Sequence, residues 1–168
     1  MPHEKKVKDL MIPLTDYPHI PYWFTIKQAI AIVKKTTLGL EGKLEPTILL
    51  IFDEKYQLVG SLSMKDLIRG IEKKFSRSGD WMSKEWDTPV FFEGLFTAGV
   101  KEEAEKPVSE IMSPIKETAQ AEDSIIKAIY IMMEKDLILL PVLDKGAVVG
   151  VIRLNEIFNE IAKLVLNE

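Results

Sequence analysis

The chain has 168 residues, of which 46% are hydrophobic, and a formal net charge of −4. This length fits one compact domain or two small interlocked ones, and the acidic balance argues against indiscriminate binding to nucleic-acid phosphates. No apolar run reaches the roughly 18 to 20 residues of a membrane helix. The absence of cysteine excludes disulfides and thiol catalysis and favours a cytoplasmic location.

The first part of the chain predicts a helix, two strands joined by a turn, and a closing helix. In chain order these are a helix over 26–35, strands over 47–52 and 57–62, and a helix over 64–75. Thr25 precedes the first helix and is a suitable N-cap, because its hydroxyl can accept a hydrogen bond from the first turn.

Residues 76–106 interrupt this pattern. They carry five large aromatic side chains, Trp81, Trp86, Phe91, Phe92 and Phe96. A flexible linker would be rich in Gly and Ser. We therefore expect this aromatic insert to cap the fold, to form a self-association surface or to dock another protein.

The last part of the chain predicts the same order of elements as the first. They are a helix over 124–135, strands over 137–143 and 147–152, and a helix over 154–166. Ser124 is a candidate N-cap, and Asp144-Lys145-Gly146 is a hairpin signal between the two strands.

A short motif precedes each set of elements, since Val7–Pro13 returns as Val108–Pro114. A repeat of this length predicts two supersecondary units that bury faces against each other. We place the first motif at 1–75, the insert at 76–106 and the second motif at 107–168. Clefts between related halves are common sites for small ligands.

This arrangement resembles a tandem pair of CBS domains, the small-ligand sensing modules named after cystathionine β-synthase. The resemblance is carried by both copies of the starting motif, by a mid-copy motif and by a Gly-x-x-Ser-x-x-Asp motif. These are Val7-x-Asp9-x-Met11, Val108-x-Glu110-x-Met112, Leu140-Pro141-Val142-x-Asp144 and Gly60-Ser61-Leu62-Ser63-Met64-Lys65-Asp66. The resemblance covers the chain outside the aromatic insert.

The resemblance implies an α/β (α+β) fold in which two β-α-β-β-α motifs pack about a pseudo-twofold axis, with two clefts between the halves. It also implies a regulatory ligand that contains adenosine, such as AMP, ADP, ATP or S-adenosylmethionine, and no required cofactor. Such pairs commonly form homodimers and regulate other proteins, so a regulated protein partner is expected elsewhere.

Ser63 and Asp66 are three residues apart at a strand-to-helix junction, so they share one face of the first helical turn. One interpretation is structural, with Ser63 as N-cap and Asp66 in the capping-box position. The other is functional. The Asp66 carboxylate can accept both hydroxyls of a ribose, while the serine hydroxyl and helix N–H groups can hold a phosphate.

The resemblance implies that residues of the other half hold the base. The candidates are Lys116, Thr118, Ala121 and Ile138. Few cations are available for phosphates, namely Lys65, Lys116 and Arg69. AMP, adenosine or S-adenosylmethionine are therefore favoured over ATP.

The second copy has Arg153 and Glu156 where the first has Ser63 and Asp66. Arg153 can supply phosphate charge, plug the cavity or pair with Glu156. The segment that faces this second cleft, residues 17–24, is aromatic, and its Tyr22 or Trp23 can stack on a purine or fill the site itself.

Catalytic and metal-binding signatures are missing. The only histidines are His3 and His19, and neither a zinc-ligand pattern nor a glycine-rich phosphate loop occurs. We expect a non-catalytic module that senses an adenosine-containing ligand between its halves, with no membrane or nucleic-acid partner. The alternative is a ligand-independent module for protein interaction or homodimerisation that uses the aromatic insert.

Overall fold

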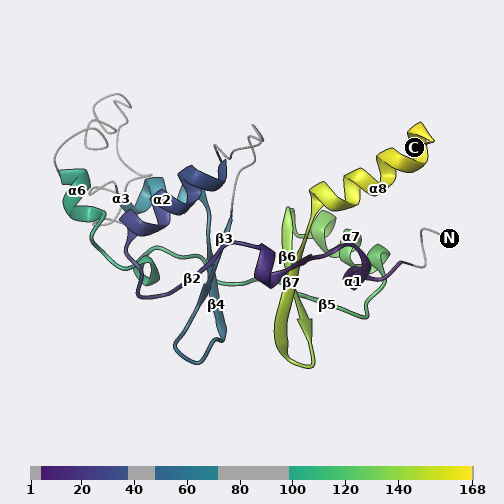
Figure 1. Cartoon of the computed structure of the whole chain (residues 1–168), viewed down its shortest axis with the longest axis horizontal. Helices are drawn as coiled ribbons and strands as arrows, with labels where there is room; N and C mark the ends of the chain where they lie inside the picture. Colours follow the sequence, from purple (N-terminus) through teal and green to yellow (C-terminus); the bar gives the residue numbers. More distant parts are fainter. Residues whose placement is uncertain (1–4, 38–47, 72–98, 168) are drawn as a thin grey trace. The chain divides into compact units, whose positions relative to one another are not determined.

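The computed structural model describes residues 5–37, 48–71 and 99–167 (Figure 1). These residues form two compact units. One, which we call the Asp66 unit, is His19–Pro114, and the other, the Glu156 unit, combines Met1–Pro18 with Ile115–Glu168. Each unit has its own hydrophobic core.

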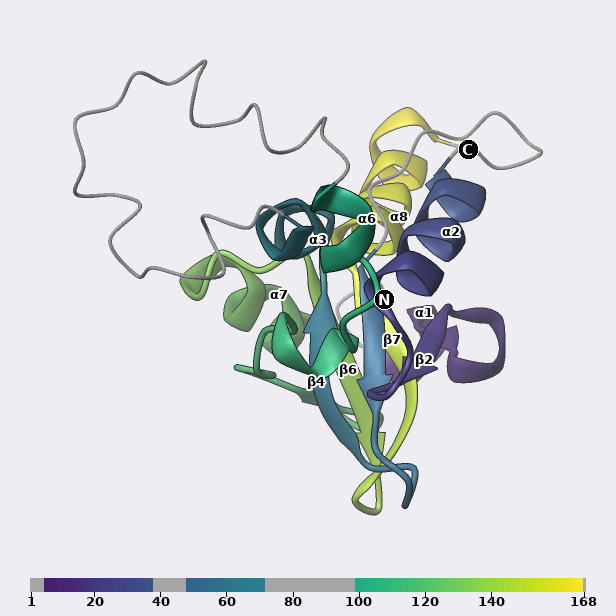
Figure 2. The same ribbon diagram turned by 90° about the vertical axis from the view of Figure 1, so that its left-hand side faces the viewer.

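The Asp66 unit contains a three-stranded sheet in the order β2-β3-β4, with the central strand parallel to β2 and antiparallel to β4. Its strands are β2 (His19–Pro21), β3 (Leu49–Phe52) and β4 (Leu58–Leu62). Its helices are α2 (Ile26–Thr37), α3 (Met64–Ile71), α6 (Gly99–Glu103) and the 3-10 helix η4 (Val108–Glu110). Helix α6 lies beside α3 (Figure 2).

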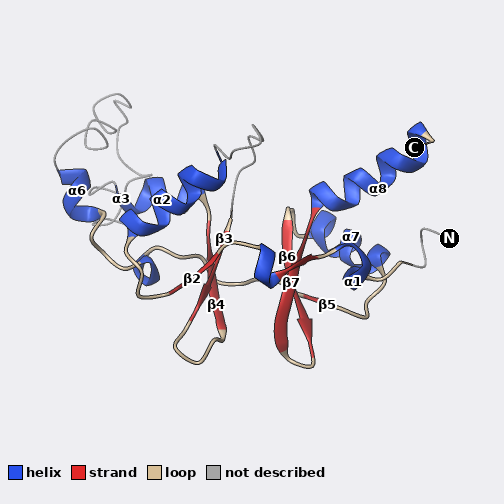
Figure 3. Ribbon diagram, viewed as in Figure 1, coloured by secondary structure: helices blue, strands red, loops and turns tan. Residues whose placement is uncertain are grey.

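The Glu156 unit contains a four-stranded sheet in the order β1-β7-β6-β5, shown in red in Figure 3. Its strands are β1 (Ile12–Pro13), β5 (Ala119–Gln120), β6 (Leu139–Asp144) and β7 (Ala147–Arg153). Its helices are α1 (Val7–Leu10), the 3-10 helix η2 (Leu14–Asp16), α7 (Ile125–Glu134) and α8 (Leu154–Leu166).

The mixed α and β class and the order of the main elements are as predicted. The predicted hairpin between β6 and β7 turns through Lys145 and Gly146, whose φ angles are 52° and 83°. Two successive positive φ values fit the tight turn that a two-residue hairpin needs. The family resemblance implied a strand before the first helix of each motif, which β2 and β5 provide. The residue spans of β1, β2 and β5 were not predicted, because such short segments carry no readable alternation.

The two sequence copies exchange their leading segments. In the Glu156 unit, the N–H of Ile125 at the start of α7 donates to the carbonyl of Lys5, and Val7 N–H donates to Asp123. In the Asp66 unit, Ile26 N–H donates to Lys106, and Val108 N–H donates to Phe24. Each leading segment therefore caps the helix of the other sequence copy.

Because of this exchange, the boundaries of the sequence repeat differ from the boundaries of the compact units. The division into 1–75, 76–106 and 107–168 follows the repeat along the sequence, whereas each compact unit takes a leading segment from the other copy. Val7 and Val108 are both fully buried. Burial of a valine side chain stabilises by about 1.5–3 kcal/mol, so the exchanged segments are part of the cores.

The described end of the aromatic insert has a structural role. Lys27 N–H at the start of α2 donates to the carbonyl of Ala104, which follows α6. The aromatic residues from Trp81 to Phe96 lie outside the described residues. Across 5–37, 48–71 and 99–167, no helix combines the length and the apolar character needed to cross a membrane.

Candidate functional site

The junction between β4 and α3 forms a complete capping box. The Ser63 hydroxyl accepts the N–H of Asp66 at 3.2 Å, and Asp66 Oδ2 accepts the N–H of Ser63 at 2.9 Å. These two bonds satisfy N–H groups that have no partner inside the helix. The structural interpretation of this pair is therefore confirmed, and it fixes the Asp66 side chain at the start of α3.

Asp66 has more than a capping function, because its second oxygen collects two further donors. Oδ1 accepts the Ser113 hydroxyl at 3.0 Å and Arg69 Nη2 at 3.1 Å. The carboxylate is 6% exposed, whereas the Arg69 side chain is 53% exposed. The result is a buried negative group whose only charged partner within hydrogen-bond distance among the described residues reaches out to solvent.

Ser113 comes from the second sequence copy and is held firmly beside Asp66. Its N–H donates to the carbonyl of Ser61 at 2.8 Å, and its own carbonyl accepts from Ser61 at 2.9 Å. Sequence reasoning missed Ser113. A signal was present, since the equivalent position of the first copy is the apolar Ile12.

Gly60 allows this close approach. A Cβ at Gly60 would lie 2.7 Å from Met112 Sδ and 2.9 Å from the Ser113 carbonyl oxygen. Both distances are shorter than a carbon can tolerate, so any side chain would push the Ser113 segment away from β4. The glycine of the Gly-x-x-Ser-x-x-Asp motif thus positions Ser113 against Asp66.

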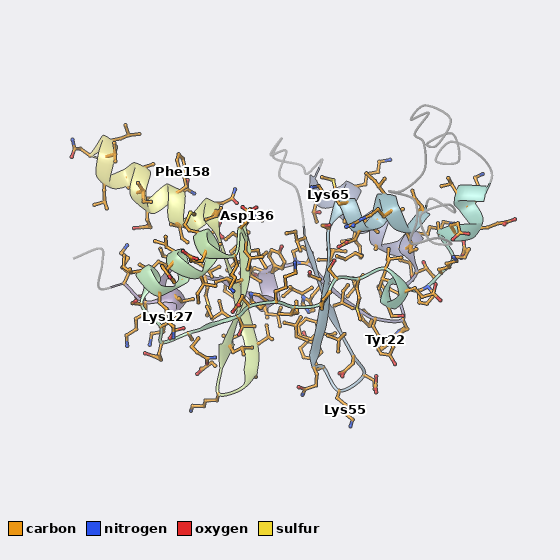
Figure 4. All side chains as sticks on the ribbon, turned by 180° about the vertical axis from the view of Figure 1, so that it is seen from behind. Tyr22, Lys55, Lys65, Lys127, Asp136 and Phe158 are labelled. Carbon is orange, nitrogen blue, oxygen red and sulfur yellow. The ribbon has the colours of Figure 1, made fainter. Side chains whose placement is uncertain are left out.

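The other predicted residue of this junction, Lys65, is exposed in the first turn of α3. Figure 4 shows it at the helix end of its sheet, with Lys55 in the hairpin at the opposite end. Lys65 therefore adds an accessible positive charge next to Asp66 in the sequence.

The four residues predicted to hold a base all belong to the Glu156 unit. Lys116 is exposed, Thr118 is half-buried and Ile138 is 51% exposed. Ala121 is buried, its N–H donates to Leu143, and its carbonyl accepts from Lys8. The Ala121 main chain is thus already used within its unit, which argues against an adenine contact through its N–H.

The equivalent junction of the Glu156 unit, between β7 and α8, is built differently. Arg153 Nε lies 2.9 Å and 3.2 Å from the two Glu156 oxygens, and Nη2 lies 2.7 Å from Oε2. The two side chains are 21% and 18% exposed. Of the three alternatives for Arg153, the structure therefore contains the pairing with Glu156.

The aromatic residues Tyr22 and Trp23 contact each other edge to face, with ring centroids 5.5 Å apart. A hydrogen bond to Glu54, reinforced by the negative charge of that carboxylate, raises the pKa of Tyr22. Trp23 remains largely exposed. The two rings thus pack against each other, and Trp23 keeps a free surface.

Within the part of the chain that the structure describes, no three His, Asp or Glu side chains converge closely enough to hold a metal ion. The chemistry available at the β4–α3 junction is therefore hydrogen bonding by a carboxylate and two serine hydroxyls, with positive charge from Arg69 and Lys65.

Comparison with known proteins shows a partial match to one family model and a likeness of fold to solved structures. Residues 108–163 match the family model of the CBS domain. The chain has the fold of a CBS-domain pair, as the family resemblance implied. No curated protein matches the chain.

Three solved structures illustrate the likeness of fold. CBSX2 in complex with AMP is 18% identical with a TM-score of 0.66, and the match covers 94% of this chain and 97% of that one. The CBS domain pair of protein MJ0100, in complex with 5′-methylthioadenosine and S-adenosylmethionine, is 18% identical with a TM-score of 0.62 and coverages of 94% and 96%.

The third is the cytosolic domain of the Mg2+ channel MgtE in complex with ATP. It is 19% identical with a TM-score of 0.61, and the match covers 94% of this chain and 49% of that chain. The present chain therefore spans about half the length of that structure.

Proposed function

We propose that the chain is a non-catalytic regulatory module that binds an adenosine-containing ligand at the β4–α3 junction. The observation that carries this proposal is the buried Asp66 carboxylate, held by Ser63 and Ser113 at a strand-to-helix junction. A fixed carboxylate in this position is suited to accept the two hydroxyls of a ribose.

The related folds support the ligand class. CBSX2 was solved with AMP, the MJ0100 pair with S-adenosylmethionine and 5′-methylthioadenosine, and the MgtE domain with ATP. All four ligands share adenosine and differ in the group at the 5′ position. We favour AMP, adenosine or S-adenosylmethionine over ATP, because Arg69 and Lys65 supply few positive charges for three phosphates.

We also propose, from the family resemblance, that Lys116, Thr118 and Ile138 contribute to binding the base. A cytoplasmic location belongs to the same proposal. Regulation follows if the ligand prefers one arrangement of the protein, since a ligand shifts an equilibrium only by its affinity difference between the two states.

The test is thermal denaturation with a panel of adenosine compounds. A ligand at 100 times its dissociation constant stabilises the folded state by about 2.7 kcal/mol. We expect Asp66→Asn to abolish this stabilisation, because the amide cannot accept both ribose hydroxyls. Glu156→Gln is the matched control, since it makes the same change at the equivalent position of the other unit, and it should keep the shift.

The sensing proposal fails if no adenosine compound raises the melting temperature, or if Asp66→Asn leaves the shift unchanged. Mass spectrometry of the denatured protein provides an independent measurement, because a tightly held nucleotide would be released on unfolding.

A second candidate function is homodimerisation through α7 and α8. Large apolar side chains on these helices are exposed, namely Ile126, Tyr130, Met133, Phe158, Ile161, Leu164 and Val165. Three of them line an apolar groove of about 300 Å³. The groove is lined by Lys5, Leu10, Ile125, Ile126, Ile129, Ile157, Glu160, Ile161 and Leu164. A surface of this kind suits a second copy of the chain, which would cover it.

Solution mass tests this candidate. Phe158→Glu places a charge at a side chain that is 68% exposed and projects from α8 (Figure 4), and it should convert a dimer to a monomer. Asn159→Glu is the control, because it adds the same charge at an already polar position. If the aromatic insert carries assembly instead, deletion of residues 76–98 removes it. The deletion must spare Ala104 and Lys106, which cap α2.

A further inference from the structure

We propose that Arg69 determines which adenosine ligands the β4–α3 junction accepts. Its guanidinium and a ribose diol compete for the same Asp66 oxygen, and the displaced guanidinium then binds a 5′-phosphate. This inference rests on the proposed function and adds to it a preference for nucleoside 5′-phosphates over adenosine and S-adenosylmethionine.

The first step is the number of donors at Asp66. A carboxylate offers about four acceptor positions, two on each oxygen. Ser63 N–H uses one on Oδ2, and Ser113 and Arg69 use two on Oδ1. A ribose diol brings two hydroxyl donors, so one of the three present donors must leave before both can bind.

The second step is which donor leaves. The Ser63 donor is a main-chain N–H fixed at the start of α3. Ser113 is fixed by its reciprocal hydrogen bonds with Ser61. Arg69 is a long side chain, more than half exposed, and exposed ion pairs are the weakest of these interactions. The diol therefore displaces Arg69.

The third step is the destination of the guanidinium. Arg69 lies three residues after Asp66 on the same face of α3, and its Nε is 3.4 Å from the Lys65 carbonyl oxygen. A 5′-phosphate is attached to the sugar that Asp66 holds, so it comes within reach of the released side chain. Guanidinium groups bind phosphate with two parallel hydrogen bonds.

The same arrangement discriminates among ligands. Binding of adenosine would break the Arg69–Asp66 ion pair, and adenosine has no phosphate that could pair with the displaced Arg69. S-adenosylmethionine carries a positive sulfonium at the 5′ position, which the guanidinium and Lys65 would repel. A single phosphate restores a partner for Arg69, so AMP is the adenosine compound that fits this junction.

Isothermal titration of AMP, adenosine and S-adenosylmethionine into wild type, Arg69→Ala and Arg69→Lys tests the inference. For Arg69→Ala we expect AMP affinity to fall about tenfold and adenosine affinity to rise about twofold, since the competitor is removed. Arg69→Lys should keep part of the AMP affinity. Lys55→Ala is the charge-matched control at the opposite end of the sheet and should change neither.

Opposite effects on the two ligands support competition by Arg69. Equal losses for AMP and adenosine, or no change in either, overturn it while the sensing function stands. A wild-type protein that binds none of the three compounds refutes the proposed function, and this inference with it. Melting temperatures of the variants show that they are folded, and Arg69→Gln replaces Arg69→Ala if the alanine variant is not.

Discussion

The β4–α3 and β7–α8 junctions have the same backbone plan and different chemistry. Each return strand contains a glycine against which the leading segment of the other copy packs, Gly60 in one unit and Gly150 in the other. The first junction then places a buried carboxylate among neutral donors and one exposed arginine, whereas the second closes on the Arg153–Glu156 ion pair. The two junctions share a scaffold, and their polar residues separate a candidate binding site from a self-paired one.

The largest expected effect concerns the two glycines. A Cβ at Gly150 would lie 2.3 Å from the Ile12 carbonyl oxygen, whereas at Gly60 its closest neighbour is the flexible Met112 side chain at 2.7 Å. We expect Gly150→Ala to cost about 3 kcal/mol or more of unfolding free energy, and Gly60→Ala about 1–2 kcal/mol. Urea denaturation measures both. Equal costs would mean that the two leading segments pack alike.

The next effect concerns Ser113, which has no polar equivalent in the Glu156 unit. Ser113→Ala removes one hydrogen bond to Asp66 and should cost about 1 kcal/mol of unfolding free energy. In an Asp66→Asn background the same change should cost less, because the charged acceptor is gone. Chemical denaturation of the single and double variants tests this. Additive costs would show that the negative charge of Asp66 does not strengthen the bond to Ser113.

The third prediction compares the two ion pairs by double-mutant cycles. Arg153 and Glu156 are mostly buried, so their coupling should be about 1 kcal/mol. The Arg69–Asp66 coupling should stay below about 0.5 kcal/mol, because Arg69 is largely solvated. A stronger coupling at Arg69 than at Arg153 would reverse the contrast between the junctions and weaken the case for a displaceable arginine.

The smallest expected effect is a difference between the two leading segments in how their stability depends on pH. Hydrogen bonds from Lys6 and Lys8 lower the pKa of Glu122 from 4.5 to about 2, while the Asp66 unit has Trp23 at the corresponding position. Because the folded value is the lower one, this stabilising contribution is present above pH 4.5 and disappears as the pH falls through about 2. It should be modest, since Glu122 is exposed.

Carboxyl titration by NMR measures the Glu122 pKa directly. Amide-exchange protection of Val7 and Lys8 should fall at acid pH in the wild type and show less pH dependence in Glu122→Gln. An ordinary glutamate pKa in the folded protein would contradict the contacts with both lysines.

Local signals predicted the elements well. Ser124 caps α7 as expected, with its hydroxyl accepting the N–H of Lys127, and α8 has the predicted bounds Leu154–Leu166. The Asp144-Lys145-Gly146 turn and the Ser63–Asp66 capping box could also be predicted, because each depends on residues close in sequence. The CBS motifs extended these predictions to the class of fold.

Features that depend on distant residues could not be predicted. Ser113 reaches Asp66 only because the leading segments are exchanged, and no local pattern encodes that exchange. The sequence left three roles open for Arg153, namely binding phosphate, plugging the cavity or pairing with Glu156. The spacing of the two residues alone does not decide between them. Ala121 was proposed as a main-chain contact to the base, but its N–H is used by the neighbouring strand.

Neither half of the sequence contains all the segments that one compact unit needs. A fragment ending at residue 75 would leave the first N–H groups of α2 without the Ala104 and Lys106 carbonyls, and its own Val7 without a pocket. A second fragment covering residues 76–168 carries both the missing carbonyls and the Val7 pocket, so the two fragments should associate when mixed, whereas either one alone should misfold.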